Sequence, residues 1–247
     1  MSKTEHFILF HQLPLIYGRV PKVANTSIKA TLSELLQQAP EQGIRSTSDA
    51  FWTQSTHGET TLISPEQAMS KRGTHFCFSF VRNPFDRLVS AYNNKVLELD
   101  DVTKPMKEMG LTHNMPFIDF VGCIIDTPDE DLDVHLMPQS KILSLNGRVI
   151  PSFVGQIEHI HEHWQALQRW MKKEGLPVLN NIPEKNVRRG NNHSDLKKYY
   201  SDMEVTRLVQ RRYREDIELF YQETDLSELI SGEKKEMSEP VMPLVSL

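Results

Sequence analysis

The chain has 247 residues, of which 38% are hydrophobic and 25% are charged, and its formal net charge is −5 at pH 7. This composition is typical of a folded globular domain, which excludes disordered and fibrous proteins, and the length favours one α/β domain. The negative charge argues against nucleic acid as a partner, so an anion site on this chain must be local. The two cysteines, Cys77 and Cys123, are too few for a secreted disulfide scaffold and favour a reducing compartment.

The first apolar run, FILFHQLPLIY, predicts a strand. It lacks the basic flank and the cleavage site of a signal peptide, and His11, Gln12 and Pro14 interrupt it. No window of the sequence contains the roughly 18 uncharged apolar residues that a membrane helix needs. We therefore expect a soluble chain without a membrane span.

A strand, a turn and a helix are predicted next. Residues 13–20 form an apolar run that ends in a polar turn, and the apolar residues after the turn recur at helical spacing. These residues are Ile28, Leu32, Leu35 and Leu36. The polar residues 39–74 predict a long surface connection with one short helix near 65–71.

A second unit of the same kind follows. The segment THFCFSFV, residues 74–81, predicts a strand, and Asn83 and Pro84 provide a helix N-cap and a first helical residue. One face of the helix carries Phe85, Leu88, Val89, Tyr92 and Val96. Two such units predict a parallel sheet that binds ligands at the carboxyl ends of its strands, with both turns at the same edge.

The later segments are less regular. The stretch FIDFVGCII fits either a helix or a strand, whereas residues 157–171 show helical spacing. Ser201 and Glu204 form a capping-box signature ahead of one long helix. Because periodicity is lost from residue 232 onward, we expect a domain over 1–231 and a flexible tail over 232–247.

The first turn brings a lysine and hydroxyl groups to the start of a helix. Lys22 precedes Asn25, Thr26 and Ser27, at a place where unpaired backbone N–H groups and the helix dipole favour a negative ligand. The turn lacks the glycines of a Walker loop or a dinucleotide loop. The alternative is that Asn25 or Thr26 merely caps the helix while Lys22 is solvated.

The second turn places Arg82 and Ser90 eight residues apart, on one side of the predicted helix. Both side chains are able to reach one phosphate group, to which arginine makes forked contacts. The alternative is a surface salt bridge between Arg82 and Asp86. Arg87 is expected to be structural.

The two segments RVPKVANTSIK and FVRNPFDRLVSAYNNK resemble the nucleotide-binding signatures of the sulfotransferases that use 3'-phosphoadenosine-5'-phosphosulfate (PAPS). The likeness is to the membrane-type carbohydrate branch and its bacterial relatives, and weaker similarity extends it over most of residues 14–222. It implies a P-loop-like sulfotransferase fold, an α/β domain with a central parallel sheet flanked by helices. Animal members begin with a Golgi membrane anchor, which this sequence does not show, so the resemblance implies a cytoplasmic protein.

The resemblance also implies roles for single residues. The first segment would wrap the 5'-phosphosulfate, and Arg82 and Ser90 would bind the 3'-phosphate. The residues of the first segment are Arg19, Lys22, Val23, Ala24, Asn25, Thr26 and Ser27. Lys22 suits the stabilisation of the leaving nucleotide, adenosine 3',5'-bisphosphate (PAP), and no metal is required.

The acceptor hydroxyl must lose a proton, and histidine is the usual base near neutral pH. The relatives place their catalytic histidine on the connection between the two turns, which implies His57. His135 is the second candidate, either as the base or as a residue that shapes the acceptor site. His75 is expected to hold a structural position in the strand, whereas His159, His161 and His163 are expected to form a solvated helix face.

A late polar loop contains Arg188 and Arg189, which contact the donor, hold an acidic acceptor, or do neither. The expected activity is transfer of a sulfuryl group to a hydroxyl of a carbohydrate or another small polar metabolite. Two alternatives stay open: a nucleotide-binding protein of the same fold without turnover, and a nucleotide kinase, although a Walker turn and a magnesium carboxylate are not evident. The sequence predicts neither the acceptor nor the oligomeric state.

Overall fold

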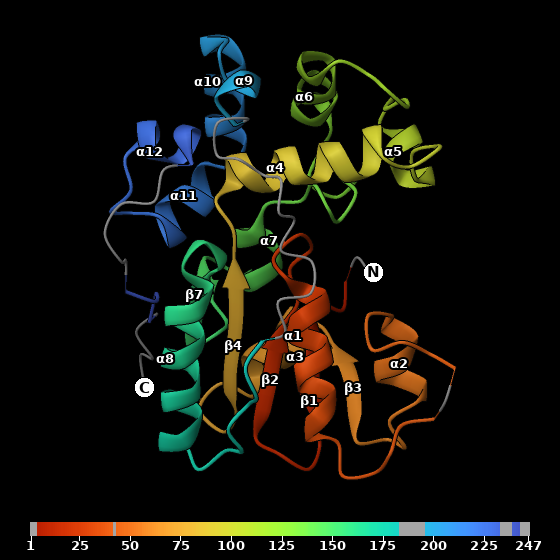
Figure 1. Ribbon diagram of the computed structural model, residues 1–247, viewed down its shortest axis with the longest axis vertical. Helices are drawn as coiled ribbons and strands as arrows, with labels where there is room; N and C mark the ends of the chain where they lie inside the picture. Colours follow the sequence, from red (N-terminus) through yellow and green to blue (C-terminus); the bar gives the residue numbers. More distant parts are fainter. Residues whose placement is uncertain (1–3, 42, 183–195, 233–238, 243–247) are drawn as a thin grey trace. The chain divides into compact units, whose positions relative to one another are not determined.

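A mixed β-sheet is the centre of the first of two units into which the chain divides (Figure 1). The structure is a computed structural model, and it describes residues 4–41, 43–182, 196–232 and 239–242. Within these residues the sheet has the order β3-β1-β2-β4-β7. Its strands are β1 (Phe7–Phe10), β2 (Leu15–Gly18), β3 (Thr60–Ile63), β4 (Phe76–Val81) and β7 (Phe153–Gln156).

The expected parallel core of the sheet is confirmed. Strands β2, β4 and β7 run parallel, whereas β1 is antiparallel to both of its neighbours. The register pairs Gly18 with Ser79, so β2 and β4 end at the same edge of the sheet. The turns that follow these two strands therefore start from one edge, as predicted.

The first apolar run forms a hairpin, and its interpretation as one strand was wrong. His11, Gln12 and Pro14 are exposed between β1 and β2, and both strands are buried along their length. The Leu15 N–H donates to the Leu13 carbonyl, 2.7 Å away, in the tight turn. The polar residues that interrupt the run mark this reversal of the chain.

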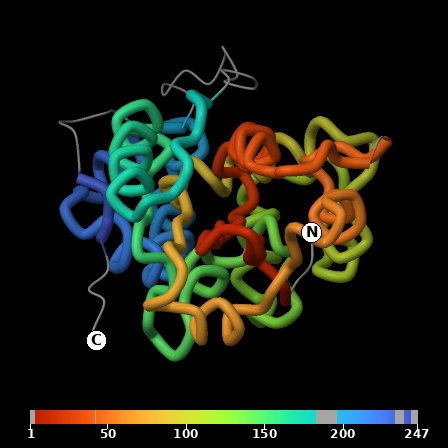
Figure 2. Tube along the Cα trace, turned by 90° about the horizontal axis from the view of Figure 1, so that it is seen from below, coloured from red at the N-terminus to blue at the C-terminus, as the bar shows by residue number. Residues whose placement is uncertain are grey.

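Helices cover both faces of the sheet. Figures 1 and 2 show α1 (Asn25–Leu32) and α8 (Ile160–Lys173) on one face and α3 (Pro65–Ser70) on the other. The Phe80 ring of β4 packs against Trp164 of α8, with ring centroids 5.8 Å apart. Gly155 of β7 leaves room for this ring, since a Cβ at this position would lie 2.4 Å from the Phe80 ring.

The connection over 39–74 contains more structure than predicted. The short helix near 65–71 is confirmed as α3, but α2 (Asp49–Gln54) and β3 were missed. Shorter elements complete this unit: η1 (Ser33–Leu35), η3 (Ile157–His159), β5 (Ser144–Leu145) and β6 (Arg148–Val149). Val241 pairs with Val154 of β7 through two backbone hydrogen bonds of 2.9 and 3.0 Å.

The second unit consists of residues 82–139 and 188–237, and its described elements are helices. They are α4 (Pro84–Tyr92), η2 (Asn93–Leu97), α5 (Lys104–Glu108), α6 (Phe117–Asp126), α9 (Leu196–Tyr199), α10 (Met203–Arg212), α11 (Arg214–Phe220) and α12 (Leu226–Ser231). Helix α7 (Gln139–Leu143) spans the division between the two units. The open choice for FIDFVGCII is settled, since it forms α6.

Two helix starts in this unit were predicted, and one is confirmed. The Asn83 side chain caps α4 by accepting a 3.0 Å hydrogen bond from the Phe85 N–H. The capping box at Ser201 is wrong, because Asp202 is the N-cap of α10 and accepts from the Glu204 N–H at 2.8 Å. The single long helix is also wrong, because α10 ends at Arg212 and α11 begins at Arg214. Tyr213 lies between them, and its buried hydroxyl donates to the Leu136 carbonyl. None of the helices in the described residues is both long and apolar enough to cross a bilayer.

Candidate functional site

The turn after β2 has an uncommon backbone. Lys22 and Ala24 both lie in the left-handed region, with φ of 70° and 56°, which residues other than glycine rarely adopt. Ala24 is the N-cap of α1, and it offers no side-chain hydrogen bond to the helix. The first turn of α1 carries no acidic residue. The helix therefore begins without the side chains that usually satisfy its N–H groups.

The alternative, in which Asn25 or Thr26 caps the helix, is wrong, because Ala24 is the N-cap. Asn25 is the first residue of α1, and its Oδ1 accepts a 3.1 Å hydrogen bond from the Tyr17 hydroxyl of β2. Thr26 is exposed and Ser27 is buried in the first turn. The start of α1 is thus tied to the sheet, and its N-cap residue gives it no side-chain hydrogen bond.

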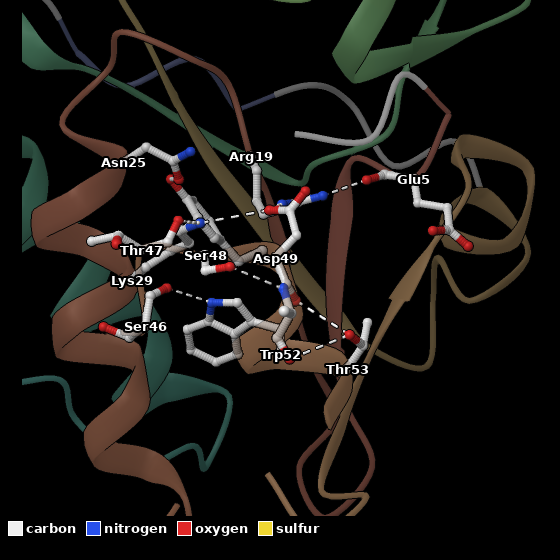
Figure 3. A network of polar contacts seen from close by, with 12 residues as sticks. Glu5, Arg19, Asn25, Lys29, Ser46, Thr47, Ser48, Asp49, Trp52 and Thr53 are labelled. Atoms are coloured by element: carbon white, nitrogen blue, oxygen red, sulfur yellow. Dashed lines mark hydrogen bonds and ion pairs between the residues drawn. The ribbon is translucent and has the colours of Figure 1, made fainter. Parts of the chain in front are cut away.

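A buried polar network lies beneath this turn (Figure 3). Arg19, which directly follows β2, has no exposed surface, and its guanidinium binds the Asp49 carboxylate and the Glu5 backbone carbonyl. Burial lowers the pKa of Arg19, and Asp49 opposes this shift. The network joins the chain before β1, the exit of β2 and the start of α2.

Lys29 of α1 belongs to the same network (Figure 3). It is buried, its Nζ donates to the Thr47 carbonyl at 2.6 Å, and it lies 3.8 Å from Asp49 Oδ1. Burial lowers the pKa of Lys29 from 10.5 to about 8; the Arg19 charge adds to this effect, and Asp49 opposes it. One carboxylate thus compensates two buried cations.

The start of α2, which carries Asp49, is itself held in place. The indole Nε1 of Trp52 donates to the Ser46 carbonyl at 2.7 Å, and Ser48 caps α2 by accepting from the Ala50 N–H. Trp52 is completely buried. The Asp49 carboxylate therefore has a fixed position against the sheet.

The turn after β4 is fixed at the main chain and at the side chain of Arg82. The Nε of Arg82 donates to Asp86 Oδ2 at 2.8 Å, which is the salt bridge considered as the alternative. The Arg82 N–H donates to Gln139 Oε1 at 2.9 Å, and Gln139 Nε2 donates to the Arg82 carbonyl at 2.8 Å. Ser90 is half-buried on α4, further along the same helix.

Buried side chains hold the segment around Gln139 in the second unit. Arg87 donates to the Met137 carbonyl at 2.8 Å, as expected of a structural arginine. Burial lowers the pKa of Arg87, while Tyr213 and Asp216 oppose the shift. Asp216 Oδ2 accepts from the Gln139 N–H at 2.9 Å.

The two candidate bases have different surroundings. His57 is exposed, has a φ of 49°, and lies with Nε2 3.0 Å from the Ala39 carbonyl oxygen. His135 is half-buried, and its Nδ1 lies 2.7 Å from Asp133 Oδ1. Burial raises the pKa of Asp133, but hydrogen bonds from His135 and Thr103 outweigh this and lower it overall. Asp133 thus holds the His135 ring in one orientation.

His163 corrects the expectation of a solvated histidine face. It is buried, and its Nδ1 accepts a 2.8 Å hydrogen bond from the Gln156 N–H at the end of β7. Its ring also lies 5.5 Å from that of His159. His163 is therefore part of the packing between β7 and α8.

A family model described as "Sulfotransferase family" matches residues 5–222, which is most of the chain. The chain belongs to the sulfotransferase family. It is 24% identical to mouse carbohydrate sulfotransferase 14 over 182 residues, which is 68% of this chain and 46% of the mouse protein. The zebrafish and human proteins of the same name are 25% and 23% identical, over 73% and 68% of this chain and 51% and 46% of their own length. The chain thus spans about half the length of these relatives. No solved structure matches at a significant level.

The site residues predicted from the sequence lie in both units. The first unit carries Arg19, the turn 22–27 and His57, and the second carries Arg82, Ser90 and His135. Arg188 and Arg189 lie outside the described residues. Within the described residues, no group of three or more His, Cys, Asp or Glu side chains is placed to hold a metal ion.

Sequence reasoning missed the residues that support the two turns. Lys29 and Asp216 stand in stretches where a charged residue normally faces solvent, and no local pattern marks them as buried. Asp49 is only partly buried, and no local pattern marks it as the partner of Arg19. For Gln139 a weak signal exists, because its stretch, HLMPQS, lies within the region over which the weaker similarity to the family extends.

Proposed function

We propose that this chain transfers the sulfuryl group of PAPS to a hydroxyl group of a carbohydrate or of another small polar acceptor. Membership of the sulfotransferase family supports the type of reaction. The names of the relatives, which are carbohydrate sulfotransferases, support the class of acceptor. The observation that carries the proposal is the uncapped start of α1 beside Lys22.

The residues of the first turn fit the 5'-phosphosulfate end of the donor. An uncapped helix start without acidic residues favours an anion, and Lys22 adds a full positive charge next to it. The left-handed backbone at Lys22 and Ala24 is the kind of local strain that persists at ligand sites. In this proposal the N–H groups of 23–26 bind the phosphosulfate, and Lys22 compensates charge on the 5'-phosphate. The donor supplies the activated sulfuryl group and leaves as PAP.

Arg19 contributes to this site through its support of the turn. Its guanidinium is buried and already bound by Asp49 and Glu5, which fixes the exit of β2 just before the phosphate-binding residues. Arg82 and Ser90 are proposed to bind the 3'-phosphate. Arg82 is suited to this role because Asp86 holds its Nε, which orients the planar guanidinium.

His57 is proposed as the general base, and His135 is a second candidate that one observation favours. The Asp133 carboxylate holds Nδ1 of His135, and such a partner orients an imidazole and stabilises it once it has taken up a proton. The His57 ring instead contacts a backbone carbonyl, Ala39. Measuring kcat for His57→Ala and His135→Ala, together with donor binding, identifies the base: its loss lowers kcat by about 100-fold or more and leaves the Kd for PAP unchanged.

Two measurements test the proposed function. Calorimetry with PAP must show binding, and labelled PAPS must transfer sulfate to at least one acceptor in a panel of sugars, lipids and phenols. Lys22→Ala is expected to abolish transfer while far-UV circular dichroism shows the fold intact. Binding of PAP without transfer to any acceptor would favour a nucleotide-binding protein without turnover, and phosphate transfer from ATP with magnesium would favour a kinase.

A further inference from the structure

We propose that Gln139 and Asp216 position Arg82 for the 3'-phosphate and thereby set the preference for nucleotides that carry this group. The inference rests on the proposed function, since it requires Arg82 to bind the donor. Gln139 and Asp216 themselves do not touch the nucleotide in this proposal. They act through the main chain of Arg82, which makes them positioning residues.

The contact between Gln139 and Arg82 is reciprocal. The side-chain amide of Gln139 accepts from the Arg82 N–H at 2.9 Å and donates to the Arg82 carbonyl at 2.8 Å. It therefore binds both main-chain groups of one residue, much as a neighbouring strand would, and it fixes the peptide planes on either side of Arg82. Only a side-chain amide offers a donor and an acceptor in this arrangement, because a glutamate would lack the donor.

Asp216 fixes the amide of Gln139 in turn. Its Oδ2 accepts from the backbone N–H of Gln139 at 2.9 Å and from Nε2 at 3.3 Å. Both residues are completely buried, so these contacts are shielded from water. Because a carboxylate only accepts, the nitrogen of the amide must point toward Asp216, and this orientation also presents Oε1 to the Arg82 N–H.

Arg82 is consequently held at two points. Gln139 holds its main chain where the chain leaves β4, and Asp86 holds its Nε at 2.8 Å. A long side chain that is ordered before the ligand arrives loses less conformational freedom on binding. Losing the Gln139 contact should therefore weaken the interaction of Arg82 with a phosphate, and should leave the rest of the nucleotide site unchanged.

The experiment compares two nucleotides that differ only in the 3'-phosphate. Calorimetry measures the Kd of PAP and of adenosine 5'-monophosphate for the wild type and for Gln139→Met. This variant keeps the length of the side chain and removes its two hydrogen bonds to the Arg82 main chain, together with the one from Nε2 to Asp216. We expect affinity for PAP to fall about tenfold, the usual effect of losing such hydrogen bonds, while affinity for the monophosphate stays unchanged. Asp216→Asn is expected to reduce the preference for PAP over the monophosphate as well, by a smaller factor than Gln139→Met does.

Gln168→Met is the matched control. Gln168 also donates from its amide to a backbone carbonyl, that of Leu179 at 2.7 Å, but it lies on α8 in the first unit. Its loss should leave the ratio of the two affinities unchanged. If Gln139→Met fails to fold, Gln139→Asn, whose amide is one methylene further from Arg82, is measured in its place.

The outcomes separate the inference from the proposed function. If Gln139→Met leaves the ratio of the two affinities unchanged, whether or not both affinities fall, then Gln139 is merely structural. This outcome would overturn the inference alone. If the wild type binds PAP no better than the monophosphate, then the proposed role of Arg82 fails, and the inference fails with it. A steady-state assay adds a second readout, in which KM for PAPS rises about tenfold and kcat changes little.

Discussion

The buried amino group of Lys29 gives the protein a pH dependence that is measurable above neutrality. Its pKa is about 8 in the folded chain, mainly because of burial, and 10.5 is its ordinary value. Between these two values the unfolded chain binds more protons than the folded chain, so the free energy of unfolding rises with pH. The cost of burying the charge is fully present below pH 8 and amounts to about 3 kcal/mol. About 2 kcal/mol of this is recovered between pH 7.5 and pH 9.5.

Lys29→Met removes the titrating group and keeps a side chain of similar length. Urea unfolding of wild type and variant at pH 7.5, 8.5 and 9.5 gives the difference between their free energies of unfolding, in which the groups common to both proteins cancel. We expect this difference to move by about 2 kcal/mol in favour of the wild type as the pH rises. Lys172→Met, at an exposed position of α8, is the control and should show no such change. If the free energies of unfolding of wild type and Lys29→Met change in parallel with pH, the reasoning is refuted.

Substitutions at three further positions test the packing around the first turn and the sheet. Asp49→Ala leaves the Arg19 charge buried without its carboxylate and should lower the free energy of unfolding by about 3 kcal/mol. This is the lower end of the range for a broken buried pair, because Asp49 is 26% exposed. An effect below about 1 kcal/mol in urea unfolding would contradict this prediction. Gly155→Ala places a Cβ against the Phe80 ring and should cost about 1–3 kcal/mol by overpacking, seen as a lower Tm; an unchanged Tm would show that the ring moves aside freely. At Ala24, whose φ is 56°, substitution by Val should destabilise by about 1–3 kcal/mol, whereas substitution by Gly relieves the backbone strain and should be neutral or stabilise by up to about 1 kcal/mol; equal Tm values for the two variants would argue against the left-handed backbone.

Features that depend on neighbouring residues were predicted well from the sequence. The spacing of apolar residues located α1, α4 and α8, and Asn83 with Pro84 marked the start of α4 correctly. Both signals act within one or two helical turns, so one segment contains all the information. The same locality explains the error at Asp202, because Ser201 and Asp202 are both good caps and tertiary packing decides between them.

Features that depend on distant residues were not predicted. The edge strand β3 is four residues long, and its place beside β1 is set by pairing across about 50 residues of chain. Lys29 is buried only because the loop before α2 offers it the Thr47 carbonyl and Asp49. The candidate site shows the same division: the turns that carry Lys22 and Arg82 were recognisable, whereas the buried groups that hold them were not.

The contact between Arg19 and the Glu5 carbonyl has a practical consequence for making shortened versions of this protein. The partner is a main-chain atom, so changing the Glu5 side chain leaves it in place, but deleting the peptide removes it. An expression clone that starts at β1 would take away an anchor of the loop after β2, even though every residue with an assigned role would still be encoded. Trimming of the amino terminus should therefore stop before residue 5, and purification tags are better joined ahead of it.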